Sequence, residues 1–331
     1  MTALADRTRT LAPGLAVALV VAAAATFLSE HYTAPVMLYA LLLGMGFNFL
    51  TENERTRPGI ELASKALLRT GVALLGLRIG WAQVTALGVG PLLMVVGLVV
   101  GTIVVAVVMA RAMGFNPLFG FLSGGATAIC GASAALALSA ALPAHERKEQ
   151  ATLFTVIGVS LFSTLAMIAY PVIAHATGLD ARQSGVFIGA TIHDVAQVVG
   201  AGYAISPEAG DTATIVKLLR VAMLLPVILV AGQITRSSAA PGTVRPPVLP
   251  WFVVAFAALV VLNSVVALPR AVLAGGNALS GWCLVASIAA IGMKTHLGDI
   301  VKVGFRPVVL MFLETALLAG MVLILLKSGA V

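Results

Sequence analysis

The chain has 331 residues, of which 60% are hydrophobic and 10% are charged, whereas an average soluble domain has about 25% charged residues. So few charges cannot cover the surface of a soluble protein of this size. The composition therefore excludes a soluble fold and predicts an all-α polytopic membrane protein. The net charge of +7 does not indicate nucleic-acid binding, because the basic residues lie mostly at helix ends and connections, as the positive-inside rule and anionic lipids favour.

Eleven apolar segments are long enough to cross a bilayer, and the connections between them are too short to hold another domain. We therefore expect a single integral membrane transporter domain over residues 1–331, with Arg7 and Arg9 holding an uncleaved N-terminus inside. The two cysteines, Cys130 and Cys283, form neither a disulfide framework nor a metal-ligand cluster, so we expect no metal and no cofactor. The segments are 11–28, 33–50, 59–79, 89–111, 116–142, 151–174, 183–203, 212–234, 249–268, 278–293 and 306–327.

The third segment, 59–79, carries three charged residues at helical spacing. Glu61, Lys65 and Arg69 are four residues apart, so they share one face of a helix and can pair along it. We interpret this segment as a helix that lies partly in the membrane interface, with its charges solvated.

The segments at 116–142 and 183–203 contain related phrases of small residues. "GGATAICGASA" spans 124–134 and "IGATIHDVAQV" spans 188–198, and both contain Gly-Ala-Thr. Glycine in mid-segment weakens a helix by roughly 1 kcal/mol per residue, and a helix broken at membrane depth must face protein or a watery cavity. Paired interrupted helices are typical of transporter binding sites. We expect two discontinuous or re-entrant helices that meet near the midplane, and the charge distribution does not decide between crossing and re-entrant geometry.

The second phrase adds the ionisable pair His193 and Asp194. An acid inside a span costs several kcal/mol and indicates function by default, so these two residues are candidates for proton coupling. The alternative is a structural pair that is hydrogen-bonded locally at a helix break. The candidate substrate ligands from the two phrases are Gly125, Thr127, Cys130, Ser133, Thr191 and Gln197.

Few other charges lie at membrane depth. Arg78 and Lys294 end two apolar segments in similar phrases, "LLGLRIG" and "AIGMKTHLG", and are candidate cations for an anionic substrate. Lys217 and Arg220, three residues apart, and Glu314 are secondary candidates. For the four basic residues the alternative is a side chain that extends to the membrane surface.

Four phrases together, "GLRIG", "SGGATAICGASAALA", "ATIHDVAQVVGAG" and "GMKTHL", resemble the YeiH-type sulfate exporter family of bacterial inner-membrane proteins. The resemblance covers essentially the whole chain. It implies placement in the sodium/proton antiporter and bile-acid symporter superfamily, with inverted repeats, and a multi-pass protein of the bacterial inner membrane. It carries over no agreed set of site residues.

From these features we expect a secondary transporter of a small sulfate- or sulfonate-like anion, with a proton or sodium as the coupling ion. Its other expected partners are membrane lipids, with a homodimer as one option. The first alternative is a sodium/proton-type cation antiporter, which needs more core carboxylates than Asp194 and Glu314. A membrane enzyme is a distant alternative, because no two aspartates lie within four residues of each other to hold magnesium. A channel is the remaining option, although no filter-like repeat is evident.

Overall fold

In the computed structural model, the described residues are 2–32, 36–79, 85, 88–142, 148–235, 251–266, 268–295 and 305–329. Within these ranges all the elements are helical. The chain divides into two compact units: Met1–Ala86 with Val199–Ser206 and Pro250–His296, and Leu87–Val198 with Pro207–Leu249 and Leu297–Val331. We call them unit 1 and unit 2. The expectation of a single transporter domain stays a prediction.

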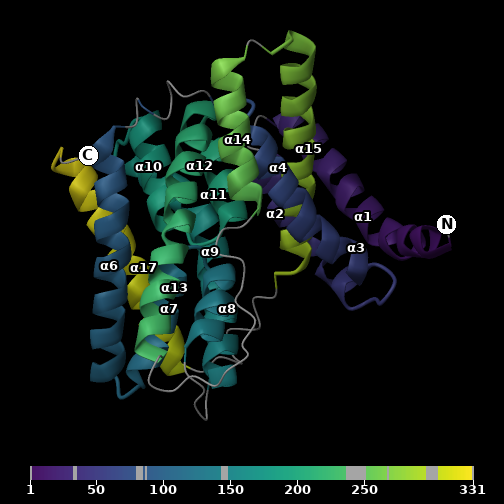
Figure 1. The fold of residues 1–331 in the computed structure, drawn as a ribbon. Coiled ribbons are helices and arrows are strands. Elements are labelled where there is room, and N and C mark those ends of the chain that lie inside the picture. The colour runs from purple at the N-terminus through teal and green to yellow at the C-terminus, as the bar shows by residue number, and fades with distance from the viewer. Residues whose placement is uncertain are drawn as a thin grey trace. The chain divides into compact units, whose positions relative to one another are not determined.

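Unit 1 is built around the long helix α15 (Arg270–Met293), which packs against α2 (Val36–Gly46) and α4 (Leu68–Leu75). Helix α1 (Thr2–Tyr32) packs on α2 and on α3 (Arg57–Leu62), and α14 (Trp251–Val265) packs on α4. A short 3₁₀ turn, η1 (Asn48–Thr51), follows α2, and a π-helical turn, η2 (Ala63–Leu67), joins α3 to α4. Figure 1 shows these elements in purple and blue, with α14 and α15 in green.

Glycines set the closest helix contacts of unit 1. A Cβ added at Gly14 or at Gly59 would collide with the backbone of the other helix, which places α1 directly on α3. Gly44 and Gly292 bring α2 and α15 together in the same way. Small residues at helix crossings are the usual means of packing in a membrane, where the hydrophobic effect between helices is absent.

Unit 2 contains both small-residue phrases. Its helices are α6 (Val89–Ala112), α7 (Pro117–Ala128), α8 (Ala132–Ala141), α9 (Lys148–Ala176), α10 (Ala181–Thr191), the first turn of α11 (Val195–Ile205), α12 (Pro207–Ala222), α13 (Leu224–Thr235) and α17 (Phe305–Lys327). Helix α6 packs on α7 and on α17, α10 packs on α12, and α17 also contacts α7, α9 and α10. Figure 1 shows α6 and α17 side by side.

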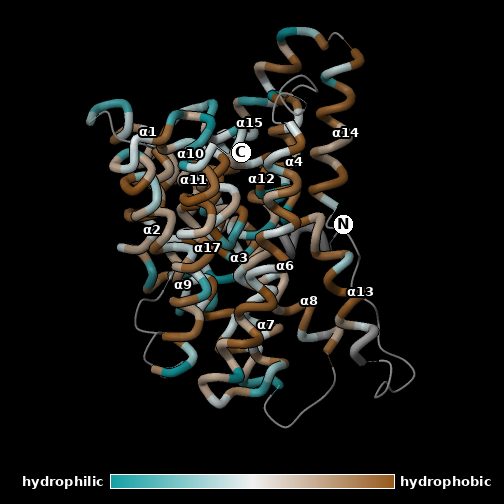
Figure 2. The backbone as a smooth tube through the Cα atoms, turned by 90° about the vertical axis from the view of Figure 1, so that its left-hand side faces the viewer, coloured by the Kyte–Doolittle hydropathy of each residue, from teal (hydrophilic) through white to brown (hydrophobic). Residues whose placement is uncertain are grey.

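Each predicted apolar segment contains helix, but the helices differ in length. By length and composition, six helices of the described chain are candidate membrane spans: Arg9–Tyr32, Val89–Ala112, Lys148–Ala176, Pro207–Gly232, Arg270–Met293 and Phe305–Lys327. Val36–Gly46, Val195–Ile205 and Trp251–Val265 are shorter apolar helices, and Figure 2 shows the last of these, α14, as mostly hydrophobic along its length. The chain is thus an all-helical, multi-pass membrane protein, while the count of eleven crossings stays a prediction.

Candidate functional site

The first small-residue phrase forms a break between two helices. Helix α7 begins at Pro117, where the side chain of Asn116 accepts a hydrogen bond from the Leu118 N–H at 2.9 Å, and it ends at Ala128. Ile129 leaves the helical region, and Gly131 adopts a φ of +64° before α8 begins at Ala132. That left-handed conformation strains a residue with a Cβ, so the third glycine of the phrase is required by the turn.

The second phrase forms the corresponding break in the next helix pair. A capping box between Asp180 and Gln183 starts α10, which ends at Thr191. Ile192 is extended, with φ −67° and ψ 139°, and α11 begins at Val195. His193 and Asp194 therefore lie in the non-helical linker. Both interruptions that the sequence predicts are present, whereas crossing or re-entrant geometry stays a prediction.

Arg220 of α12 joins the two breaks through the carbonyl groups at the ends of α7 and α10. Its Nε donates to the Ala128 carbonyl at 2.7 Å, and its Nη2 donates to the Thr127 carbonyl at 2.7 Å. Its Nη1 donates to the carbonyls of Gly189 at 3.2 Å and Ile192 at 3.0 Å. The last carbonyls of a helix have no partner inside the helix, and one guanidinium supplies partners for both helices.

Lys217, one turn earlier on α12, makes the same kind of bridge. Its Nζ donates to the Ile129 carbonyl at 2.7 Å and to the Ile192 carbonyl at 2.9 Å. The side chains of Lys217 and Arg220 are buried, so these two cations do not extend to the surface of unit 2. An ammonium group has three N–H donors, and the two carbonyl contacts use two of them.

Asp194 lies against the start of α8. A Cβ added to Gly131 would be 2.9 Å from the Asp194 carboxyl carbon, and the backbone N–H of Ala132 donates to the carboxylate. The Asp194 N–H in turn donates to the Ser163 hydroxyl of α9 at 2.9 Å. Anionic groups are stabilised at a helix N-terminus, so the acid of the second break occupies the N-terminal end of the helix after the first break.

His193 and Glu314 connect the breaks to α17. The His193 Nδ1 is 3.1 Å from the Thr127 carbonyl, which can only accept, so Nδ1 carries the proton. Its Nε2 is 2.9 Å from the Thr315 hydroxyl. The neighbouring Glu314 is buried and accepts hydrogen bonds from Ser123 at 2.7 Å and from Thr127 at 3.2 Å. Among the described residues, neither Glu314 nor Asp194 has a salt-bridge partner within 4.0 Å.

The remaining candidates in the two phrases have mixed surroundings. Thr191 donates to the Phe187 carbonyl of its own helix at 2.6 Å, and Cys130 is a buried free thiol. Ser133 is exposed. Gly125 packs against Leu138 of α8. The buried Gln197 Oε1 lacks a hydrogen-bond partner among the described residues, which makes it the one unsatisfied acceptor next to the second break.

Arg78 and Lys294 belong to unit 1, whereas the groups described above belong to unit 2. Arg78 is exposed and lies over the Tyr203 ring, 5.3 Å from its centroid. The Lys294 Nζ donates to the Ser64 hydroxyl at 3.3 Å. Neither cation belongs to unit 2, and the part that each plays in a substrate site stays a prediction.

Sequence reasoning missed three hydroxyl groups that take part in this cluster: Ser123, Ser163 and Thr315. Ser123 lies directly before the first phrase and Thr315 directly after Glu314, so proximity to a candidate was an available signal for both. Nothing local in the sequence distinguishes Ser163 from the other hydroxyl residues of α9.

Comparison with known proteins places the chain in a family. A family model described as conserved hypothetical protein 698 matches residues 13–311. A UPF0324 membrane protein of Chlorobaculum tepidum is 50% identical over 314 residues, which cover 94% of this chain and 88% of the relative. The chain belongs to the UPF0324 membrane protein family. Another UPF0324 member, named TauZ, from Paracoccus pantotrophus, is 50% identical over 93% of this chain and 92% of its own length.

A UPF0324 membrane protein of Caulobacter vibrioides is more distant. It is 38% identical over 93% of this chain and 67% of the relative. No solved structure matches the chain. The UPF0324 relatives thus span nearly all of this chain, so both units, including the two breaks in unit 2, lie within the shared region.

Proposed function

We propose that the protein is a secondary transporter that carries a small sulfate- or sulfonate-like anion by alternating access around the two interrupted helices, with a proton as the coupling ion. The observation that carries this proposal is the position of Lys217, a buried cation that contacts the carbonyl ends of both breaks. A buried charge in a membrane protein is costly and marks a substrate or ion pathway by default.

The anion would find three kinds of hydrogen-bond donor at this place. The third N–H of Lys217 is one. The first N–H groups of α8 and of α11 are the others, because helix N-termini are ready sites for anions. Arg220 contributes less, since four carbonyls already occupy its donors. The choice of a sulfate- or sulfonate-like anion rests on the resemblance to YeiH-type sulfate exporters.

Asp194 would couple the proton to the anion. Its carboxylate occupies the N-terminal end of α8, which is also the place where an anionic substrate would accept hydrogen bonds. Protonation to the neutral acid removes the competing negative charge, so proton and anion would bind together. Both ring nitrogens of His193 are hydrogen-bonded, one to α7 and one to α17. We therefore assign His193 a structural role, in which it fixes the second break to these two helices.

The runner-up function is a sodium/proton-type antiporter. The buried Glu314 and the partly buried Asp194 of unit 2 favour it, because neither has a salt-bridge partner within 4.0 Å among the described residues. Such a protein would bind sodium or lithium at these carboxylates and would show no preference among anions.

Thermal unfolding of the purified full chain in an uncharged detergent separates the two functions. The choline salts of sulfate and of methanesulfonate should raise the Tm above its value in choline chloride, because ligand binding stabilises the folded state by RT ln(1 + [L]/Kd). The rise should become larger as the pH falls, because protonation of Asp194 favours binding of the anion. In Asp194→Asn the stabilisation should persist and lose its pH dependence. The exposed Glu149→Gln in the same unit serves as the control. Stabilisation by sodium or lithium chloride, with none from either anion, contradicts the proposal and supports the antiporter.

A further inference from the structure

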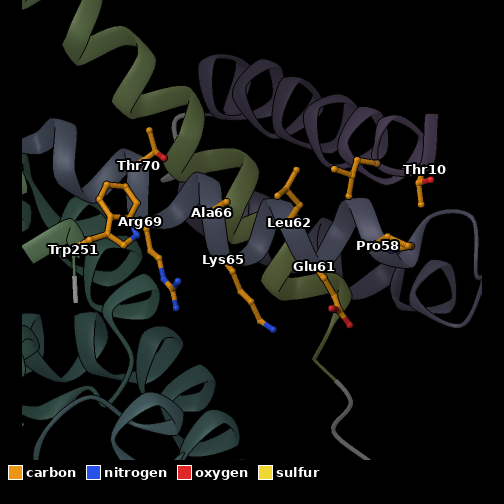
Figure 3. Close-up of a pocket in the computed structure, with 10 residues that line it drawn as sticks. Thr10, Pro58, Glu61, Leu62, Lys65, Ala66, Arg69, Thr70 and Trp251 are labelled. Carbon is orange, nitrogen blue, oxygen red and sulfur yellow. The ribbon is translucent and has the colours of Figure 1, made fainter. Parts of the chain in front are cut away.

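Unit 1 contains a cavity of about 530 Å³ that the proposed transport site does not use. The helix formed by α3, η2 and α4 lines one side of it with Glu61, Lys65 and Arg69, and Trp251 of α14 lies at one end. Figure 3 shows the three charged side chains extending the same way from one face of this helix. The sequence predicts that shared face from their spacing, and the π-helical turn η2 at Ala63–Leu67 keeps it.

The charge of this cavity is positive. Lys65 and Arg69 have exposed side chains. The one carboxylate of the lining, Glu61, is held by Arg57 at 3.5 Å. Close by, burial of the side chain and then the positive charge of Lys65 lower the pKa of Lys294, against the opposing effect of Glu61. Cations therefore outnumber acids here, as expected of a site that takes an anion.

The walls of the cavity are mostly apolar. Leu11 of α1, and Pro58, Leu62 and Ala66 of the α3–α4 helix, line it together with the exposed indole of Trp251. Tryptophan is enriched where the headgroups of a membrane meet its hydrocarbon core. A hydrated inorganic ion gains nothing from such walls, whereas a lipid can place its headgroup beside the cations and its acyl chains along the apolar residues.

We propose that this cavity binds an anionic phospholipid, with the headgroup phosphate between Lys65 and Arg69 and with hydroxyl contacts from Thr10 and Thr70. Basic pockets between membrane helices bind anionic headgroups in this way. The apolar lining and Trp251 favour a lipid over a free phosphate ion, and every residue of the lining belongs to unit 1.

The test is the thermal unfolding of the purified full chain in an uncharged detergent with added lipid. Phosphatidylglycerol should raise the Tm, whereas phosphatidylcholine and inorganic phosphate should not. In Lys65→Gln/Arg69→Gln the affinity for phosphatidylglycerol should fall about 30-fold, since each cation near an anionic headgroup contributes a factor of roughly 5. Arg270→Gln, an exposed arginine at the start of α15 in the same unit, is the matched control and should keep the full effect.

A second variant controls for nonspecific effects of removing a charge from the cavity. Glu61→Gln removes the acid of the lining and should tighten the binding of phosphatidylglycerol. The proposal fails if phosphatidylcholine stabilises the wild-type chain equally well, or if the double variant keeps the full response. It also fails if inorganic phosphate matches phosphatidylglycerol, because the site would then take a soluble anion.

Discussion

At the scale of single residues, Gly131 allows the two breaks to come into contact, because it has no side chain to displace Asp194. It has a φ of +64°, and a Cβ there would collide with the Asp194 carboxylate. Gly178 has nearly the same φ, +65°, but nothing lies within 4 Å of the position of its Cβ. The two glycines therefore separate the cost of the backbone conformation from the cost of displacing Asp194.

We expect Gly178→Ala to lower the free energy of unfolding by about 1 kcal/mol, the cost of a left-handed residue with a side chain. Gly131→Ala should lower it by about 2 kcal/mol more, because the acid must also move from the start of α8. Unfolding by denaturant in mixed micelles measures both. Equal losses in the two variants would mean that Asp194 does not lie against Gly131.

Arg220 offers a second residue-scale prediction. Arg220→Gln should lower the free energy of unfolding by about 3 kcal/mol or more, because carbonyls at the ends of both α7 and α10 lose a charged donor inside the protein. Arg220→Lys should fall between the wild type and Arg220→Gln, since one ammonium cannot reach the same four carbonyls. Arg111→Gln, at an exposed position of α6, should cost less than about 1 kcal/mol. A similar small loss in Arg220→Gln would contradict the bridging role.

The sequence alone predicts part of this chemistry. Asp194 and His193 are recognisable because an acid beside small residues in an apolar segment is unusual. The partners of Lys217 and Arg220 are backbone carbonyls between 25 and 93 positions away. Every residue has a carbonyl, so no side-chain pattern distinguishes these acceptors before the fold brings them together.

At the scale of elements, the two interrupted helices pack by the same device. Gly120 and Gly124 of α7 lie against Ala106 of α6, and Gly185 and Gly189 of α10 lie against α12. A Cβ at Gly189 would be 2.5 Å from the Ala213 carbonyl oxygen. This Gly-x-x-x-Gly spacing allows close backbone approach, and it places α10 near enough to α12 for Arg220 to reach the Gly189 carbonyl.

Gly189→Ala should therefore separate α10 from α12 and lower the free energy of unfolding by about 1–3 kcal/mol, the usual cost of overpacking. Gly97→Ala is the matched control, since this glycine lies inside α6 with nothing within 4 Å of its Cβ position. It should be neutral or raise stability by up to about 1 kcal/mol, because alanine favours a helix. Chemical denaturation of both variants measures the free energy of unfolding. A loss of stability in Gly97→Ala as large as in Gly189→Ala would refute the close approach of α10 to α12.

The positions of the helices and of both breaks follow from local signals, namely apolar runs, Pro117 after a capping asparagine, and glycine in mid-segment. The choice of packing partner for each helix does not follow from local signals, because the apolar faces are chemically alike. The four-residue glycine spacing in α7 and α10 is a local signal for close packing, yet it does not name α6 and α12 as the partners.

At the scale of the whole molecule, the candidate residues fall into two units. Arg78 and Lys294 lie in unit 1 and the two breaks lie in unit 2. Similar phrases at the ends of two apolar segments indicate a relation between Arg78 and Lys294, but they contain no information about which unit the segments join. Unit 1 alternates along the chain with unit 2, and such long-range pairing is decided by packing that a single sequence does not reveal.

The most direct test of proton-coupled anion transport records the internal pH of liposomes that contain the purified protein, with a trapped pH-sensitive dye. A gradient of sulfate or methanesulfonate should change the internal pH in wild-type vesicles. Vesicles with Asp194→Asn should show no pH change but should still exchange labelled anion across the membrane, because the anion donors remain while the proton site is lost. A pH change driven by a sodium gradient, with none driven by either anion, would contradict a proton-coupled anion transporter built on the two helix breaks.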